Sequence, residues 1–284
     1  MKQTTVNPIK IPYIKITAQT ICQKFLLYAF HALSINSTHI CIILNLLFIK
    51  FLLIIIIMVV SKSVIELRNV TKIYKLGRVE VPALKKINLK IKRAEFIAIM
   101  GKSGSGKSTA LNLIGCLDLP TYGEIFLDGI NIAKLSENEL ARIRGKKIGF
   151  VFQRFNLIQT LTALENVMLP MMFQGVSEKE KRAVELLKIV GLEKRADHKP
   201  AELSGGEVQR IAIARALANE PEIILADEPT GNLDSKTGKD ILQILKKINK
   251  EKNTTLIIVT HDEAIARTAE KIIHLKDGEI ANES

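Results

Sequence analysis

The sequence predicts an α/β fold with a parallel β-sheet at its core. Short apolar runs that suit buried strands alternate with helical patterns, which is typical of a parallel sheet. The predicted strands of this sheet end near residues 100, 152, 226, 259 and 275. We expect a second, small antiparallel sheet of shorter strands from residues 64–91 and 124–132, and a helical subdomain from residues 154–205.

The composition of the 284-residue chain fits a globular protein of one or two domains. Its three cysteines have no paired spacing, which argues against a disulfide framework or a zinc cluster. We expect Cys116 to be a buried apolar residue rather than a reactive thiol. Of the formal net charge of +12, residues 1–61 contribute +5 and residues 62–284 carry +7, a mild excess that suits an anionic membrane surface or nucleic acid or reflects only a general basic bias of the proteome.

The N-terminal segment, residues 1–61, differs from the rest of the chain because it contains five lysines and no acidic residue. Within it, residues 40–60 are apolar except for Asn45 and Lys50, and a stretch of this length can span a bilayer as a helix. A lysine near the centre of such a span is energetically costly, which opposes a membrane anchor.

A misassigned start is the alternative that we favour for this segment. Met58 is the only methionine between the first residue and Met100, and regular strand and helix signals begin at Ser63. A chain that starts at Met58 keeps a suitable size for one domain. We therefore expect residues 63–281 to form the folded domain, whether the preceding segment is an anchor or is not made.

A glycine-rich loop is the clearest chemical signal. The stretch "GKSGSGKS", residues 101–108, fits the pattern G-x-x-x-x-G-K-[ST] and lies between a strand-like run, "EFIAIM", and a helical run, "STALNLIG". Backbone N–H groups of such a loop and the helix N-terminus bind phosphate oxygens. The loop thus predicts binding of ATP phosphates, with contacts from Gly101, Ser103, Gly104, Ser105, Gly106, Lys107, Ser108 and Thr109.

A pair of acidic residues ends a second buried-strand candidate, "PEIILADEPT". Asp227 at the end of this run is placed to hold Mg²⁺ together with the Ser108 hydroxyl. Side chains alternate along a strand, so the adjacent Glu228 points elsewhere. We therefore expect Glu228 to be the base for the attacking water.

The stretch "LSGGE", which begins at Leu203, resembles the signature motif of ABC-type ATPases. The resemblance covers residues 63–281 and includes further motifs in the family's order. These are Tyr74 of the adenine-stacking aromatic, Gln153 of the Q-loop, Asp234 of the D-loop and the switch histidine His261. The resemblance implies a P-loop NTPase with a RecA-like core, and it places Gln153 among the catalytic and metal-binding residues.

Two of these residues also have plain structural interpretations. A lone histidine is usually structural, but His261 follows the buried strand "TLIIVT", and ligands bind at the carboxyl edge of an open α/β sheet. Tyr74 lies on a predicted strand, where a tyrosine often serves only packing. The expected catalytic set is Glu228, His261, Lys107 and Gln153, and the expected metal set is Ser108, Gln153 and Asp227.

The signature motif opens a helix, with Ser204 as a suitable N-cap. In the family, this N-terminus binds the γ-phosphate held by a second subunit, which implies nucleotide contacts from Ser204, Gly205, Gly206 and Asp234. Two nucleotides are then sandwiched in a dimer. The family usually has glutamine where this chain has Glu207. A carboxylate near a triphosphate weakens closure unless it points to solvent, and we expect a modest effect.

The stretch "TLTALENVMLP" resembles the lipoprotein-releasing and macrolide-exporter branch of the family. The resemblance implies a membrane permease as partner, a second ATPase subunit as homodimer partner, and a location at the cytoplasmic face of the membrane. We expect no nucleic acid as partner. Two alternatives remain, namely a soluble ABC ATPase of DNA repair or translation, and an ATPase that regulates cell-wall enzymes through a division-type membrane subunit.

The predicted helical subdomain carries two further expectations. In "SEKEKRAVELLKIVGL", we expect Ser177 and Glu180 to form a capping box and Gly191 to end the helix. Six apolar side chains are candidates for a groove that receives the permease, with about half of them in the subdomain core: Phe155, Leu157, Met168, Met171, Met172 and Phe173.

Overall fold

The computed structural model describes residues 63–77 and 79–284. The expectations for residues 1–61, including a start at Met58, lie outside these ranges. Within them, no helix has both the length and the hydropathy that a bilayer-spanning segment requires.

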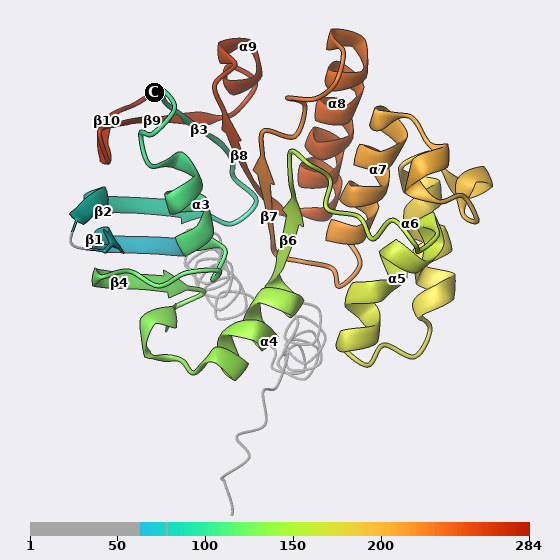
Figure 1. Cartoon of the computed structure of the whole chain (residues 1–284), viewed down its shortest axis with the longest axis horizontal. Helices are drawn as coiled ribbons and strands as arrows, with labels where there is room; N and C mark the ends of the chain where they lie inside the picture. The colour runs from blue at the N-terminus through green and yellow to red at the C-terminus, as the bar shows by residue number, and fades with distance from the viewer. Residues whose placement is uncertain (1–62, 78) are drawn as a thin grey trace, which may run out of the picture. The chain divides into compact units, whose positions relative to one another are not determined.

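The expected parallel core is present as a six-stranded sheet within the described residues, in the order β10-β9-β3-β8-β7-β6. Neighbouring strands are parallel except for the edge pair β9 and β10 (Figure 1). The strands are β3 (Phe96–Met100), β6 (Ile148–Val151), β7 (Ile223–Asp227), β8 (Thr255–Thr260), β9 (Lys271–Lys276) and β10 (Glu279–Glu283). The strand ends that the sequence predicts are confirmed within one residue.

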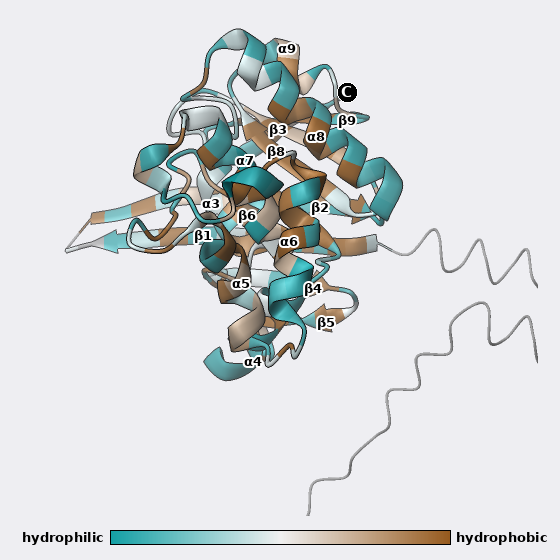
Figure 2. Ribbon diagram, turned by 90° about the vertical axis from the view of Figure 1, so that its right-hand side faces the viewer, coloured by the Kyte–Doolittle hydropathy of each residue, from teal (hydrophilic) through white to brown (hydrophobic). Residues whose placement is uncertain are grey.

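Side chains on both faces of this sheet are buried, which explains why its central strands are apolar without interruption. Ile99 and Val259 belong to the hydrophobic cluster that includes α3 (Lys107–Ile114). Ile224 and Ile258 belong to the cluster on the other face, which includes α7 (Gly205–Ala216) and α8 (Ser235–Lys252). Figure 2 shows hydrophobic residues gathered on the central strands.

The expected antiparallel sheet is also present, with its described strands in the order β2-β1-β4-β5. The expectation of shorter strands is wrong for two of them, because β1 and β2 have 14 residues each. They pair along almost their whole length, and one apolar face of the pair is buried in the core. The strands are β1 (Ser63–Leu76), β2 (Val79–Lys92), β4 (Tyr122–Leu127) and β5 (Ile130–Asn131).

Helices fill the expected subdomain range between β6 and α7. They are α5 (Ala163–Phe173), α6 (Lys179–Ile189) and two short 3₁₀ turns, Glu193–Arg195 and Pro200–Glu202. The remaining described helices are α4 (Glu137–Lys147), α9 (Glu263–Ala266) and the 3₁₀ turn Ile132–Lys134.

The expected capping box of α6 is wrong. The N-cap is Glu178, without a side-chain hydrogen bond to the helix, because α6 begins later than the spacing of Ser177 and Glu180 requires. The helix does end before Gly191, whose φ of 73° is a left-handed conformation that glycine adopts at low cost. Cys116 is buried as expected, and burial raises the pKa of its thiol to about 11.

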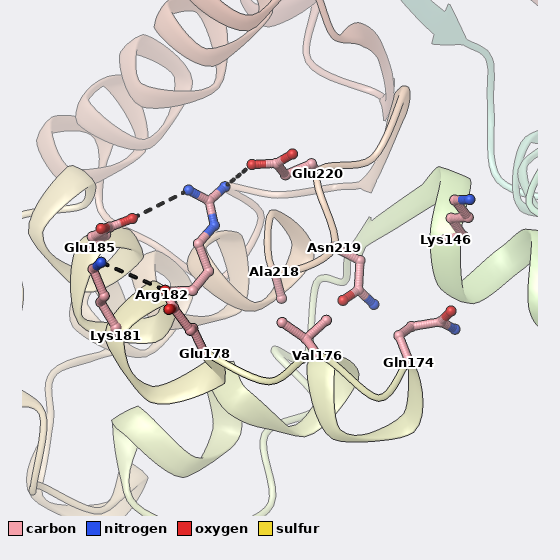
Figure 3. A pocket seen from close by; sticks show the side chains of 10 residues that line it. All are labelled: Lys146, Gln174, Val176, Glu178, Lys181, Arg182, Glu185, Ala218, Asn219 and Glu220. Atoms are coloured by element: carbon pink, nitrogen blue, oxygen red, sulfur yellow. Dashed lines mark ion pairs between the residues drawn. The ribbon is translucent and has the colours of Figure 1, made fainter. Parts of the chain in front are cut away.

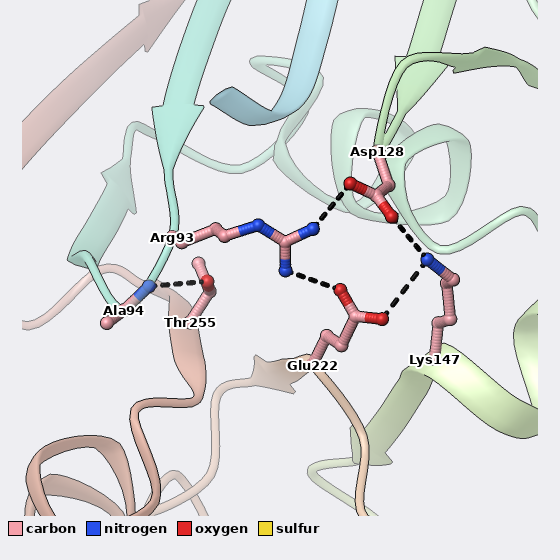
Figure 4. Close-up of polar contacts among 6 residues, drawn as sticks. All are labelled: Arg93, Ala94, Asp128, Lys147, Glu222 and Thr255. Carbon is pink, nitrogen blue, oxygen red and sulfur yellow. Dashed lines mark hydrogen bonds and ion pairs between the residues drawn. The ribbon is translucent and has the colours of Figure 1, made fainter. Parts of the chain in front are cut away.

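A network of four charged side chains joins the two sheets (Figure 4). Arg93 follows β2, Asp128 follows β4, Lys147 ends α4 and Glu222 precedes β7. Arg93 pairs with Asp128 and lies 2.6 Å from Glu222, and Lys147 lies 2.7 Å from Asp128 and 3.1 Å from Glu222. Each charge therefore has two partners of opposite sign, at the end of the sheet opposite to the glycine-rich loop.

Candidate functional site

The glycine-rich loop connects β3 to α3, as the sequence predicts. Gly106 caps α3 with a φ of 101°, and a Cβ at this position would lie 2.5 Å from the carbonyl oxygen of Ala83. Only glycine combines this backbone conformation with so close an approach. The loop can therefore turn sharply into the helix, whose first N–H groups have no partners within the helix.

Lys107 begins α3, and its side chain is almost entirely buried. Its ammonium group donates hydrogen bonds to the carbonyl oxygens of Gly101 at 2.8 Å and Lys102 at 2.9 Å. These bonds hold a positive charge beneath the loop. An anion above the loop would meet this charge and the positive end of the helix dipole together.

The loop forms one wall of a cavity of about 380 Å³ at the carboxyl ends of the central strands. The other walls include Asp227 at the end of β7 and His261 after β8, which the fold brings together from distant parts of the chain. Nine of the predicted site residues line this cavity: Ser103, Gly104, Gly106, Lys107, Ser108, Thr109, Asp227, Glu228 and His261.

Two loop residues with an expected nucleotide contact lie beside the cavity. Gly101 and Ser105 are not among the described residues that line it. A Cβ on Gly101 would collide with the Ser105 hydroxyl and the Leu275 carbonyl oxygen, so these two residues pack against each other under the loop. In the structure they support the loop.

Asp227 ends β7 and lines the cavity. Burial raises the pKa of its carboxyl group, and the neighbouring Glu228 raises it further, while Lys107 opposes both effects. A cation bound at the same place would favour the charged form of this carboxyl group and so oppose the effect of burial.

Glu228 and His261 are in hydrogen-bond contact in the cavity, where Nδ1 of His261 lies 2.8 Å from Oε1 of Glu228. Glu228 has a φ of 44°, a strained value for a residue with a side chain. Its N–H donates to the Val259 carbonyl at 2.9 Å, and its own carbonyl accepts from the Gly231 N–H at 3.0 Å. These bonds hold Glu228 in a turn, away from the line of β7.

Gln153 lies next to this pair, in the exposed segment after β6. The side chains of Gln153 and Glu228 meet beside Gly231. A Cβ on Gly231 would lie 2.9 Å from Nε2 of Gln153 and 3.3 Å from Oε2 of Glu228. Asn232 also donates a hydrogen bond of 2.8 Å to the Gln153 carbonyl. Gly231 and Asn232 therefore position this segment, a role that the motif "GNLD" alone does not reveal.

Tyr74 is not among the described residues that line the cavity. Its hydroxyl donates to Asp118 at 3.0 Å, and the ammonium group of Lys72 lies 5.0 Å from the centre of its ring. These contacts within the chain fix the orientation of the ring on β1. The role of Tyr74 in adenine stacking stays a prediction.

The signature residues lie apart from the cavity, at the N-terminus of α7. Ser204 is the N-cap, as expected, and it forms a capping box with Glu207. Asp234 is the N-cap of α8 and accepts hydrogen bonds of 3.1 Å from the N–H groups of Lys236 and Thr237. One protomer therefore does not bring its own signature residues to its own phosphate loop.

The Glu207 carboxylate does not point freely to solvent. One oxygen accepts hydrogen bonds from the Ser204 N–H at 2.9 Å and from the Ser204 hydroxyl at 2.8 Å, and the other lies 3.3 Å from Nε of Arg195. Bonds to Ser204 and the charge of Arg195 lower the pKa of Glu207. An ionised carboxylate thus occupies the donors of the signature serine.

A second hollow, of about 560 Å³, lies between α4, α6 and the α7–β7 connection (Figure 3). Its charged side chains are largely paired with one another: Arg182 lies 3.0 Å from Glu220 and 3.6 Å from Glu185, and Lys181 lies 3.6 Å from Glu178. None of the predicted site residues lines it. The predicted chemistry belongs to the smaller cavity at the strand ends.

A glycine-rich loop between a buried strand and a helix, facing an acid at the end of another strand of the same sheet, defines a P-loop NTPase. The ABC transporter family matches residues 84–231. The chain is 60% identical over 225 residues to the ABC transporter ATP-binding protein MJ0796 of Methanocaldococcus jannaschii, covering 77% of this chain and 96% of that protein. The chain therefore belongs to the ABC transporter family, and it is an ATPase subunit of that family.

Two further similarities bear on the branch and the fold. The chain is 47% identical over 226 residues to the macrolide export ATP-binding/permease protein MacB of Syntrophobacter fumaroxidans, covering 78% of this chain and 32% of that protein. The dimeric structure of MJ0796 bound to ADP and Pi matches with a TM-score of 0.73 and 57% identity, covering 78% of this chain and 97% of the other. The expected branch and fold class are thereby confirmed.

Proposed function

We propose that this chain binds and hydrolyses ATP as a dimer and thereby drives a separate membrane subunit of the macrolide-export or lipoprotein-release type. One observation carries the chemical part: the Glu228–His261 pair shares a cavity with the phosphate loop. The part that concerns the membrane subunit is supported by the similarity to MacB proteins, which are macrolide export ATP-binding/permease proteins.

The residues in and beside the cavity have separate roles in phosphate binding and in activation of the attacking water. Loop N–H groups and Lys107 bind the β- and γ-phosphates, because they present positive charge where negative charge develops. Oε2 of Glu228 takes the proton of the attacking water, while His261 holds Oε1 and so orients the carboxylate. Gln153 lies beside Glu228 and orients the same water.

The same cavity suits Mg²⁺ as the companion of ATP. Within the described residues, no group of three or more His, Cys, Asp or Glu side chains is placed to hold a metal without help. Mg²⁺ prefers oxygen ligands and usually combines one or two carboxylates with substrate phosphates. Asp227, the Ser108 hydroxyl and the Gln153 amide oxygen would hold it, and it would neutralise charge on the phosphate oxygens.

The second half of the proposal is a dimer in which each protomer completes the other's site. Ser204 and Gly205 are exposed at the N-terminus of α7, away from the protomer's own phosphate loop. The Gly205 N–H group, and the Ser204 donors once they are released from Glu207, can bind the γ-phosphate held by a second copy. The dimeric state of MJ0796 supports this arrangement.

A surface for the membrane subunit lies around α5. Of the six groove candidates, Leu157 and Met171 are buried, Phe155 and Met168 are partly buried, and Met172 and Phe173 are exposed at 56% and 81%. Phe173 borders a separate hollow of about 560 Å³ together with Leu169 and Pro170. Because Arg142 and Arg144 also line this hollow, an amphipathic helix of the permease suits it, and such a helix would hold the chain at the cytoplasmic face of the membrane.

The partner is tested by capture from native membranes. The full chain with Glu228→Gln and an affinity tag is incubated with solubilised membranes and ATP, and bound proteins are identified by mass spectrometry. We expect a membrane protein with a large external domain, and Phe173→Asp should lose it. Recovery of only ribosomal or DNA-repair proteins, or of a division-type membrane protein, would replace the proposal with one of the two alternatives.

A further inference from the structure

Gln209 is a fully buried polar residue to which the proposed mechanism gives no role. It lies in α7, one turn beyond the signature residues at the N-terminus of that helix. Its neighbours in the core of this face, such as Ile211 and Ala212, are apolar. A glutamine at such a position must be explained by the hydrogen bonds that it makes.

The Gln209 side chain makes one bond and lacks another. Nε2 donates a hydrogen bond of 2.6 Å to the carbonyl oxygen of Pro229. Oε1 is buried and has no hydrogen-bond partner among the described residues. An unpartnered buried acceptor destabilises the fold, so a leucine or methionine would suit the surroundings of this side chain better. What a leucine would lose is the bond to Pro229.

The Pro229 carbonyl belongs to the turn that sets the position of Glu228. Glu228 has a φ of 44° and directly precedes a proline, and both features make its backbone conformation unfavourable. A strained residue keeps such a conformation only when its surroundings fix it. Two of the bonds that do so, to Val259 and from Gly231, come from neighbouring parts of the same site.

The bond from Gln209 is different, because it comes from the helix that carries the signature residues. α7 is a continuous helix from Gly205 to Ala216. If its N-terminus moves, the first half of the helix moves with it, and Gln209 lies in that half. Through its bond to the Pro229 carbonyl, the Gln209 amide group would pass that displacement to the residue next to Glu228.

We propose that Gln209 is a positioning residue that ties the Glu228–Pro229 turn to the signature helix, so that the seating of α7 against a second protomer sets the Glu228 carboxylate for hydrolysis. The inference rests on the proposed function of Glu228 as the base. It adds that hydrolysis depends on the position of α7 within the same protomer, through a single side-chain bond.

The test compares Gln209→Leu with a matched control in the full chain. Asn249 is also a buried amide, with Nδ2 bonds to the carbonyls of Ala94 at 2.9 Å and Thr254 at 2.8 Å, at the opposite end of the sheet. We expect Gln209→Leu to lower kcat for ATP by about 10- to 100-fold with little change in KM. Asn249→Leu should lower the melting temperature at least as much and leave kcat nearly unchanged.

Hydrogen exchange supplies a readout that does not depend on turnover. The N–H groups of Glu228 and Gly231 are hydrogen-bonded at the turn, so a loosened turn exchanges them faster. We expect faster exchange of the peptide around residues 228–231 in Gln209→Leu and not in Asn249→Leu. If Gln209→Leu does not fold, Gln209→Asn, whose shorter amide cannot reach Pro229, is measured in its place.

The outcomes separate this inference from the proposed function. Wild-type kcat and wild-type exchange in the Gln209 variant would overturn the inference alone, provided that Glu228→Gln is inactive. Equal losses of kcat in the Gln209 and Asn249 variants would also overturn it, because they would reflect general destabilisation. Wild-type turnover by Glu228→Gln would overturn the role of Glu228 and this inference with it.

Discussion

Nδ1 of His261 lies 2.8 Å from Oε1 of Glu228, although the two residues are 33 positions apart and follow different strands. The Glu228 side chain is mostly buried, with 19% exposed, whereas His261 is 69% exposed. The histidine therefore contacts one oxygen of the carboxylate, and in the proposed mechanism the other oxygen is left for the attacking water.

This pair gives the first prediction. His261→Ala should lower kcat by about 100-fold, because the carboxylate loses the group that orients it, with a smaller effect on KM. His261→Gln keeps a donor for Glu228 and should retain more activity than the alanine variant. Steady-state ATPase assays measure both, and equal activity of His261→Ala and wild type would exclude the orienting role.

The charge beneath the phosphate loop gives the second prediction. Lys107→Ala should weaken ATP binding by about 10- to 100-fold, since a charge-assisted contact with phosphate is lost. Lys102→Ala is the matched control, because Lys102 is an exposed lysine of the same loop whose carbonyl, and not its ammonium group, bonds to Lys107. Equilibrium titration with a fluorescent ATP analogue checks the difference, and similar affinities for the two variants would refute it.

Glu207 gives the third prediction. Its carboxylate holds the Ser204 donors that the proposed dimer needs for the partner's γ-phosphate. Glu207→Gln keeps the capping geometry and removes the charge, so the ATP concentration for half-maximal dimerisation should fall about two- to fivefold. Sedimentation in the Glu228→Gln background measures this, with the exposed Glu279→Gln as control. A higher ATP requirement for Glu207→Gln would contradict the idea that Glu207 competes with the γ-phosphate for the Ser204 donors.

The charge network between the sheets gives the fourth prediction. Burial opposes ionisation of Asp128, but the pairs with Lys147 and Arg93 outweigh it and lower its pKa. A carboxylate with a lowered pKa in the folded state stabilises the fold above its unfolded pKa, about 4, and this contribution is lost as the pH falls further. Asp128→Asn should lower the free energy of unfolding by about 1–2 kcal/mol at pH 7.

The difference in stability between Asp128→Asn and wild type should shrink as the pH falls below about 4, where the carboxyl groups begin to be protonated. Urea denaturation across this pH range measures it. Glu263→Gln, which breaks an exposed pair with Arg267, is the control and should leave the stability at neutral pH unchanged. A pH-independent effect of Asp128→Asn would mean that its packing, and not its charge, stabilises the fold.

The parts of the fold and site that follow from the sequence are those encoded locally. The order of strands and helices, the phosphate loop at Gly106 and the acid at the end of β7 each depend on a short stretch of chain. Contacts between distant segments carry no such local signal. The bond from Gln209 to Pro229 and the pairing of Arg93 with Glu222 join residues 20 and 129 positions apart.

Local rules also fail where the rest of the fold decides the outcome. The spacing of Ser177 and Glu180 matches a capping box, but α6 begins after Glu178. The place of Tyr74 on a strand follows from the sequence, whereas its bond to Asp118, 44 positions away, does not. Side-chain partners of this kind are set by how distant segments, here β1 and the connection after α3, pack together, which no short stretch of chain encodes.

The most direct measurement is the behaviour of the full chain with Glu228→Gln in the presence of ATP. Sedimentation should show ATP-dependent dimers, and ATPase assays should show kcat reduced by about 1000-fold or more, because the base is lost while the phosphate loop is intact. Hydrolysis near the wild-type rate, or a chain that stays monomeric at saturating ATP, would contradict the assignment of Glu228 as the base of an ATP-closed dimer.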